Sequence, residues 1–192
     1  MTTNIILKSI AKHISLTKEE QDYFVSLLTE KKYKAKQFIA REGEVCKLLT
    51  FINKGCCRTY NIDKNGFEHI LYFSSQEYWV GDLYSFLTNK PGVLFVQAMQ
   101  ETEVLQMKTS DFEMLYEKIP KFERMFRILA ENAYVDTMKR VMEGMSLSAE
   151  ERLEVFNKKY ATIKNLLPQK QIALYLGVTP EFFSRMKKKQ KS

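Results

Sequence analysis

The side chains best suited to chemistry lie near the end of the chain, in the segment Gln169 to Lys189. Arg185 carries the paired N–H donors that fit a guanine edge in a major groove, and Glu181 can accept from a cytosine amino group. A stabilising charge in the first turn of a helix is the alternative role for Glu181. Ser184 suits either a base or a phosphate, and Lys187 and Lys189 suit the phosphate backbone.

Two short helices joined by a tight turn are predicted to present these side chains. Gly177 is suited to end the first helix, because glycine takes a positive φ without steric cost. Thr179 is a good N-cap for the second helix, with Pro180 at its first position. Their apolar faces are expected from Ile172, Ala173, Leu176, Val178, Phe182, Phe183 and Met186. The order is typical of a DNA-binding helix-turn-helix, and a plain helical hairpin is the alternative.

Positive charge is concentrated in the same part of the chain. Residues 148–192 hold ten Lys and Arg against four Asp and Glu, so they carry +6 of the chain's net +7. An electrostatic footprint of this kind fits a phosphate backbone. A solubilising tail would explain the lysines after Met186, but it would not explain Lys158, Lys159, Lys164 and Lys170.

The middle of the chain, from about Lys32 to Met107, has the pattern of a β domain. Short runs rich in Phe, Ile, Val, Tyr and Thr alternate with turn residues, which predicts an antiparallel sandwich or barrel. A short helix is expected within it, from Asp82 to Leu87. The expected strands are Leu48–Ile52, Cys57–Ile62, His69–Phe73, Leu94–Met99 and Glu103–Met107.

Helices are expected on both sides of this β domain. Residues 4–30 are predicted to be helical, and capping boxes are expected at Thr17, Ser110 and Ser148. A long helix is predicted from Pro120 to about Gly144, with two apolar stripes. One stripe, Phe122, Phe126, Leu129 and Ala133, is expected to pack on the β domain. The other is expected to bind a second copy of the chain through Ile128, Val135, Met138 and Met142. A helix buried within one chain is the alternative.

Composition excludes several classes of protein. The three cysteines are Cys46, Cys56 and Cys57, and all three are expected to be structural. With only His13 and His69 in addition, neither a zinc site nor a cupin-type metal enzyme is expected. No apolar run reaches the roughly 20 residues of a membrane span, and no signal peptide is recognisable. We therefore expect a cytoplasmic protein that is not an enzyme and has no membrane partner.

The order of these parts resembles the Crp/Fnr family of transcription regulators. Arg41–Glu44, Ile52–Gly55 and Trp79–Leu83 are similar to motifs of that family's β-roll. The resemblance implies an α+β fold with an antiparallel β-roll of the jelly-roll type, a long dimerisation helix and a small winged-helix-like helix-turn-helix domain. The implied boundaries are 1–118, 119–145 and 146–192. It also implies that the groove-facing positions are Thr179, Glu181, Ser184, Arg185 and Lys188.

The effector cassette departs from the family's pattern. Cyclic-nucleotide-binding members have a Glu for the ribose and an Arg for the phosphate, whereas this chain has Asp82 and no cation in Pro91–Phe95. An unpaired buried phosphate is costly, so cyclic AMP is not expected to bind unless Lys90 reaches in. The cassette is then either a pocket for another ligand or a vestige filled by Phe86, Leu94 and Phe95. The candidate effector pocket is Gly81, Asp82, Leu83, Val93 and Leu94.

These features together predict a dimeric, sequence-specific DNA-binding regulator. Its partners would be double-stranded DNA with a near-palindromic site, a second copy of the chain and, through the resemblance, RNA polymerase. No cofactor is predicted, and the iron–sulfur branch of the family is excluded because it needs four cysteines. The alternative is a ligand-binding or protein-interaction module of the same fold that has lost specific DNA recognition.

Overall fold

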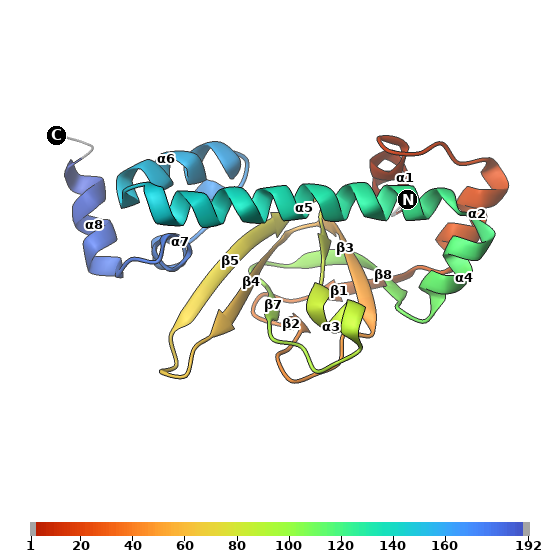
Figure 1. Ribbon diagram of the computed structural model, residues 1–192, viewed down its shortest axis with the longest axis horizontal. Coiled ribbons are helices and arrows are strands. Elements are labelled where there is room, and N and C mark those ends of the chain that lie inside the picture. The colour runs from red at the N-terminus through yellow and green to blue at the C-terminus, as the bar shows by residue number, and fades with distance from the viewer. Residues whose placement is uncertain (1–2, 190–192) are drawn as a thin grey trace.

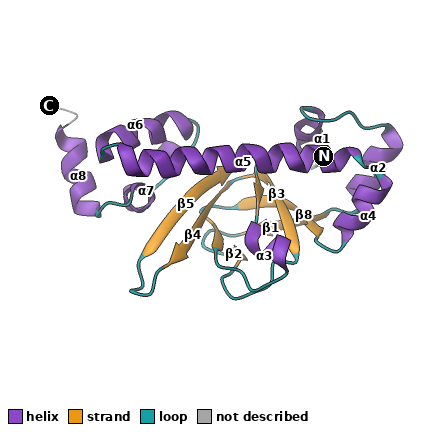
Figure 2. Cartoon of the chain, in the orientation of Figure 1, coloured by secondary structure: helices purple, strands orange, loops and turns teal. Residues whose placement is uncertain are grey.

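A computed structural model describes residues 3–189 of the chain. A single helix, α5 (Lys121–Ser146), runs along the long axis of the molecule, and a β-roll lies along one side of that helix (Figure 1). One group of helices gathers at one end, and a second group gathers at the other (Figure 2). The first group is α1 (Asn4–Ala11), α2 (Lys18–Ser26) and α4 (Asp111–Lys118). The second group is α6 (Ala149–Lys159), α7 (Gln169–Leu176) and α8 (Pro180–Lys189).

The β-roll consists of two four-stranded antiparallel sheets, with strand orders β1-β8-β3-β6 and β2-β7-β4-β5. The strands of the first sheet are β1 (Thr29–Tyr33), β8 (Thr102–Lys108), β3 (Leu48–Lys54) and β6 (Trp79–Val80). Those of the second are β2 (Phe38–Ala40), β7 (Phe95–Ala98), β4 (Cys56–Ile62) and β5 (Glu68–Ser75). All five expected strands are therefore present. The short strands β1, β2 and β6 had no clear sequence pattern of their own.

The two faces of β4 serve different cores, as the alternation of side chains along a strand requires. Cys57 points into the β-roll, where it packs with Ile52, Val80 and Val96. Its neighbour Cys56 lies on the outer face and belongs to a separate cluster that includes the C-terminal helices. All three cysteines are free thiols.

The N-terminal and C-terminal capping boxes form as expected, and the middle one does not. The hydroxyl groups of Thr17 and Ser148 each accept a hydrogen bond from the backbone N–H of the Glu three residues later. The carboxylate of that Glu accepts in turn from the backbone N–H of the cap residue. Ser110 has helical backbone angles and its side chain makes no cap hydrogen bond, so that prediction was wrong. The helical run expected over 4–30 is two helices, and β1 already begins at Thr29.

The long helix α5 extends two residues beyond Gly144, where it was expected to end. Phe122 is fully buried, and Phe126 and Leu129 pack around it against the N-terminal helices. Met125 is buried in the same cluster. Ala133 is exposed, so the stripe that packs on the β domain ends one turn earlier than expected. From Ala130 to Lys139 every side chain of α5 is exposed.

The C-terminal helices pack against the outer face of the second sheet. Leu153 and Phe156 of α6 and Ile172 of α7 share one core with Tyr60 and Phe73 of the sheet. The polypeptide between α6 and α7 contains a 3-10 turn, η1 (Lys164–Leu166). Between residues 109 and 189 the structure contains helices and no strand. The helix-turn-helix is therefore built from helices alone, and it packs against the β-roll of its own chain.

Candidate nucleic-acid interface and effector cassette

The turn between α7 and α8 has the geometry expected of a helix-turn-helix. Gly177 adopts φ 68°, which ends α7 in the left-handed region. The Val178 N–H donates to the Ala173 carbonyl at 3.1 Å. The Phe182 N–H donates to Thr179 Oγ1 at 3.2 Å, so the Thr179 side chain caps α8. The turn is thus fixed by hydrogen bonds at both helix ends.

The buried face of α8 orients the opposite face toward solvent. Phe183 and Met186 are buried in the core shared with α7, whereas Phe182 is 40% exposed and was wrongly assigned to that face. Glu181, Ser184 and Arg185 are exposed. Because 181 and 185 are one turn apart, these side chains form one continuous polar surface.

The three lysines predicted to contact DNA differ in their exposure. Lys188 is exposed and belongs to the same surface as Arg185. Lys187 is half-buried, with its Nζ 5.8 Å from the Phe183 ring centre. Lys189 is the last residue of α8, and its side chain lies outside the described part of the chain. Among the residues 3–188, neither Glu181 nor Arg185 forms an ion pair, so both are available to a ligand.

The carboxylate of Asp82 accepts the backbone hydrogen bonds of the effector cassette. Asp82 is 1% exposed and precedes α3 (Leu83–Thr88), the expected short helix. Its Oδ1 accepts from the Ser85 N–H at 3.0 Å. Its Oδ2 accepts from the N–H groups of Val93 and Leu94 at 2.7 and 2.9 Å. Three backbone donors therefore already hold a negative charge at the start of α3, and none of them remains for a ligand anion.

Gly92 permits this close approach. A Cβ atom at position 92 would lie 2.9 Å from Asp82 Oδ2, and 3.1 Å from the Glu44 carbonyl oxygen. The buried Ser85 ties the cassette to the rest of the β-roll, because its hydroxyl donates to the Lys90 carbonyl and accepts from the Cys46 N–H. Lys90 itself is exposed. The hydrogen bonds thus fold the cassette onto Asp82.

The expected pocket residues do not converge on one space. Asp82 meets the backbone of 93 and 94, but the side chains of Leu83 and Val93 are exposed. The aromatic residues expected to fill a vestigial pocket also lie elsewhere. Phe86 packs on Phe112, and Phe95 stacks on Tyr60 outside the roll.

A tyrosine that the sequence did not single out faces the interior of the roll beside the cassette. Burial raises the pKa of Tyr72, and the nearby charge of Asp82 raises it further. The phenol therefore remains a neutral hydrogen-bonding group near the cassette. No sequence signal identified Tyr72, because its place beside the cassette follows from the tertiary fold of the β-roll.

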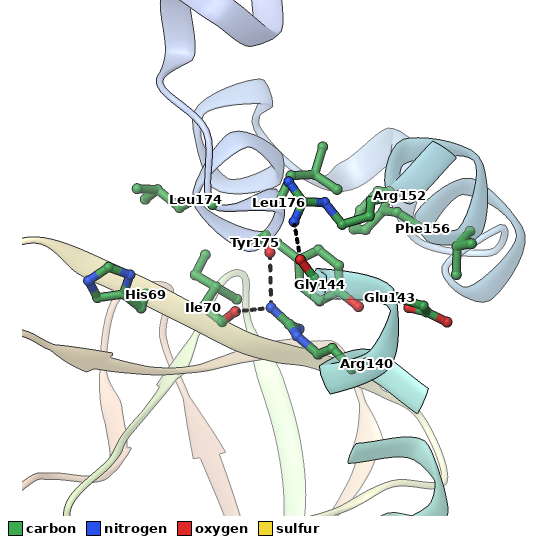
Figure 3. Close-up of a pocket in the computed structure, with 12 residues that line it drawn as sticks. His69, Ile70, Arg140, Glu143, Gly144, Arg152, Phe156, Leu174, Tyr175 and Leu176 are labelled. Atoms are coloured by element: carbon green, nitrogen blue, oxygen red, sulfur yellow. Dashed lines mark hydrogen bonds between the residues drawn. The ribbon is translucent and has the colours of Figure 1, made fainter. Parts of the chain in front are cut away.

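Two arginines join the β-roll to the helix-turn-helix, and neither was recognised in the sequence. Arg58 on β4 donates to Gln171 of α7 at 2.7 Å, and it also pairs with Glu68 of β5. Arg140 on α5 donates to the carbonyl oxygens of Ile70 and Tyr175 at 2.7 and 2.9 Å (Figure 3). Its guanidinium also lies 3.8 Å from the Tyr175 ring centre. These contacts fasten α7 to the β-roll.

One side of α5 carries apolar side chains that are largely exposed within the described part of the chain. Val135, Met138 and Met142 are 48, 40 and 55% exposed, whereas Ile128 is half-buried. These positions follow heptad spacing, with 128, 135 and 142 seven residues apart. Further exposed apolar residues of the same helix are Tyr134, Val141 and Met145.

Comparisons with known proteins agree with this architecture. Residues 30–119 match the family described as "Cyclic nucleotide-binding domain". The c-di-GMP responsive global regulator CLP of Xanthomonas campestris matches with a TM-score of 0.75 at 13% identity, over 91% of this chain and 92% of that one. The chain has the fold of the Crp/Fnr regulators. The expected resemblance to that family is therefore confirmed for the fold.

Two further solved structures have the same fold. FixK2 from Bradyrhizobium japonicum matches with a TM-score of 0.74 at 19% identity, over 84% of this chain and 83% of that one. A putative transcriptional regulator of the Crp/Fnr family from Eubacterium rectale matches with a TM-score of 0.73 at 18% identity, over 89% and 82%. No curated protein matches the chain in sequence.

The described residues also bear on two of the expected absences. Between residues 3 and 189, no helix combines the length and apolar character needed to cross a bilayer. Within the same residues, no group of three His, Cys, Asp or Glu side chains is placed to hold a metal ion.

Proposed function

We propose that the protein is a dimeric, sequence-specific DNA-binding regulator of transcription that is not an enzyme. The observation that carries this proposal is the exposed polar face of α8, where Glu181, Ser184 and Arg185 stand free on a helix anchored by Phe183 and Met186. A helix presented in this way fits a major groove, and its side chains can read base edges. The excess of positive charge after Leu147 supports binding to the phosphate backbone.

Dimerisation through α5 is part of the proposal. Exposed apolar side chains at heptad spacing are costly in water and are covered when two such helices pack. Two chains related by a two-fold axis would carry two copies of α8. Half-sites roughly 34 Å apart on one face of the duplex would then form a near-palindromic operator. RNA polymerase would be a partner of the DNA-bound dimer.

The β-roll is proposed to act without cyclic AMP. Asp82 already occupies the backbone donors of the cassette, and no cationic side chain of Pro91–Phe95 could balance a phosphate. Burying a second negative charge beside Asp82 without a counter-charge would be strongly unfavourable. The cassette therefore serves as a fixed structural part of the β-roll.

Selection of bound duplexes from a random DNA pool, at two salt concentrations, tests the proposal. A dimeric regulator is expected to enrich a two-fold symmetric motif at both. Binding without an enriched motif and with a steep salt dependence would contradict sequence-specific recognition. In that case the protein-interaction or ligand-binding module would be the better interpretation. Calorimetric titration with cyclic AMP is expected to give no saturable heat.

A further inference from the structure

A cavity lies where the β-roll, the long helix and the helix-turn-helix meet. Its volume is about 220 Å³, and Figure 3 shows the side chains that surround it. The wall includes His69 and Ile70 of β5, Arg140 of α5, Arg152 of α6 and Tyr175 of α7. The cavity thus lies between the β-roll, α5 and the first two C-terminal helices, α6 and α7.

Two guanidinium groups face this cavity without a carboxylate partner. Among the residues 3–188, neither Arg140 nor Arg152 forms an ion pair. Arg58, at the same interface, is by contrast neutralised by Glu68. Glu143 also lines the cavity, but its carboxylate is directed away from both guanidinium groups in Figure 3. The cavity is therefore electropositive and partly shielded from water, which favours an anion.

Arg152 is the less satisfied of the two. Its Nε is buried and has no hydrogen-bond partner within the described part of the chain. Its Nη1 makes one long contact, 3.5 Å to the Gly144 carbonyl oxygen. Leaving a buried charged donor unpaired costs free energy that an acceptor would recover. The Nε–H and Nη–H donors of a guanidinium match the two oxygens of a carboxylate, so an anion in the cavity would supply the acceptor that Arg152 lacks.

The apolar part of the wall limits the size of an occupant. It includes Val155, Phe156, Leu174 and Leu176. A volume of about 220 Å³ is smaller than the roughly 300–1,000 Å³ of sites that hold drug-sized ligands. A small occupant with one charged end and one apolar end fits these walls. A cyclic nucleotide, with its large polar base and ribose, does not.

We propose that this cavity is a binding site for a small organic carboxylate, held through Arg152 with its apolar body against the α6 and α7 side chains. Bound there, the ligand would link Arg152 of α6 to the side of α5 that already holds Ile70 and Tyr175 through Arg140. It would stabilise the docked position of the helix-turn-helix. An influence on DNA binding rests on the proposed function above, whereas ligand binding itself does not.

Calorimetric titration of the full-length protein with benzoate, and with its neutral isostere benzamide, tests this site. Benzoate is expected to bind saturably and benzamide at least about tenfold more weakly, because only the carboxylate can pair with a guanidinium. Arg152→Met, which keeps the apolar stem and removes the charge, is expected to weaken benzoate binding at least about tenfold. Lys158→Met removes a charge from the exposed side of the same helix and should leave binding unchanged.

A second readout uses the wild-type protein and does not depend on the folding of a variant. In nitrogen-15 spectra, the Arg152 Nε–H signal is expected to shift with benzoate at the calorimetric affinity. The site is disproved if benzoate gives no saturable heat, if benzamide binds equally well, or if Arg152→Met binds like the wild type. A protein that binds benzoate through Arg152 but selects no DNA motif would refute the proposed function and leave this site standing.

Discussion

Arg185 and Asp82 use charge in opposite ways. The Arg185 guanidinium is exposed and has no ion-pair partner among the residues 3–188, so its donors are free for another molecule. The Asp82 carboxylate is buried and accepts three backbone hydrogen bonds from its own cassette. The first side chain is placed for recognition, and the second stabilises the fold.

Removing the Arg185 side chain is expected to weaken specific DNA binding. We predict that Arg185→Ala costs roughly 1–3 kcal/mol on the selected operator and relaxes the preference at one base pair of each half-site. Fluorescence anisotropy with operator and scrambled duplexes measures both effects. Arg124→Ala, which removes an exposed arginine at the far end of α5, is the control and should change neither affinity. An equal loss on both duplexes would contradict base reading by Arg185.

Replacing Asp82 is expected to destabilise the β-roll. Asp82→Ala leaves the N–H groups of Ser85, Val93 and Leu94 without their acceptor, and we predict a loss of about 3 kcal/mol in the free energy of unfolding. Urea denaturation measures it. Asp22→Ala removes an exposed carboxylate that pairs with Lys18 across one turn of α2 and should cost less than about 0.5 kcal/mol. Equal losses in the two variants would show that the Asp82 carboxylate has no special role.

The three thiols are expected to react at different rates. Burial raises the pKa of Cys56 to about 11 and that of Cys57 to about 12, so both remain protonated and shielded at pH 8. Cys46 is half-exposed. Titration with a thiol-specific chromogenic reagent at pH 8 should show one rapid thiol in the native protein and three after denaturation. Two or three rapid thiols in the native protein would contradict the burial of the adjacent pair.

At the scale of whole elements, α5 carries the prediction about assembly. Met138→Glu with Met142→Glu places two charges in the exposed apolar stripe, and we expect the dimer to dissociate because those charges would be buried in the contact. Sedimentation equilibrium should then give the mass of one chain. Thr137→Glu, also exposed on α5 but outside the heptad positions, is the control and should remain dimeric. A wild-type protein that is monomeric would reject the proposed interface.

Elements with local signals could be predicted from the sequence. The strands from β3 to β5, the capping boxes at Thr17 and Ser148, and the turn at Gly177 each depend on residues close together in the chain. Ser110 had the same local pattern but formed no cap, because α4 is entered from a residue that is already helical. The backbone conformation at Ser110 is set by the tertiary structure, which the local sequence pattern does not reveal.

The site was predictable only where it is contained in one element. The exposed face of α8 follows from the helical period, so Glu181, Ser184 and Arg185 could be assigned in advance. The roles of Asp82 and Arg58 could not be assigned. Asp82 accepts hydrogen bonds from residues 93 and 94, beyond the helix α3, and Arg58 donates to Gln171, 113 positions away. Such partners follow from tertiary structure, which one sequence without relatives does not reveal.

At the scale of the molecule, the helix-turn-helix is held on the β-roll by few polar contacts. Arg140→Met removes the donors to Ile70, Leu71 and Tyr175, and we expect faster local opening of α6 to α8. Hydrogen exchange should therefore accelerate in those helices and stay unchanged in β3 and β8. Lys139→Met, a neighbouring exposed residue, is the control. Uniform acceleration throughout the chain would mean a global loss of stability instead of undocking.

The joint between α5 and α6 has a mechanical consequence. α5 ends at Ser146 and Ser148 already caps α6, so a single extended residue, Leu147, connects the two helices. A connection this short acts as a pivot and not as a tether. α5 is about 39 Å long, so we expect it to act as a lever arm, in which a small tilt at the β-roll would give a larger displacement of α8 once the C-terminal helices undock. Lengthening the pivot by a few glycines would leave each part intact and disconnect the lever.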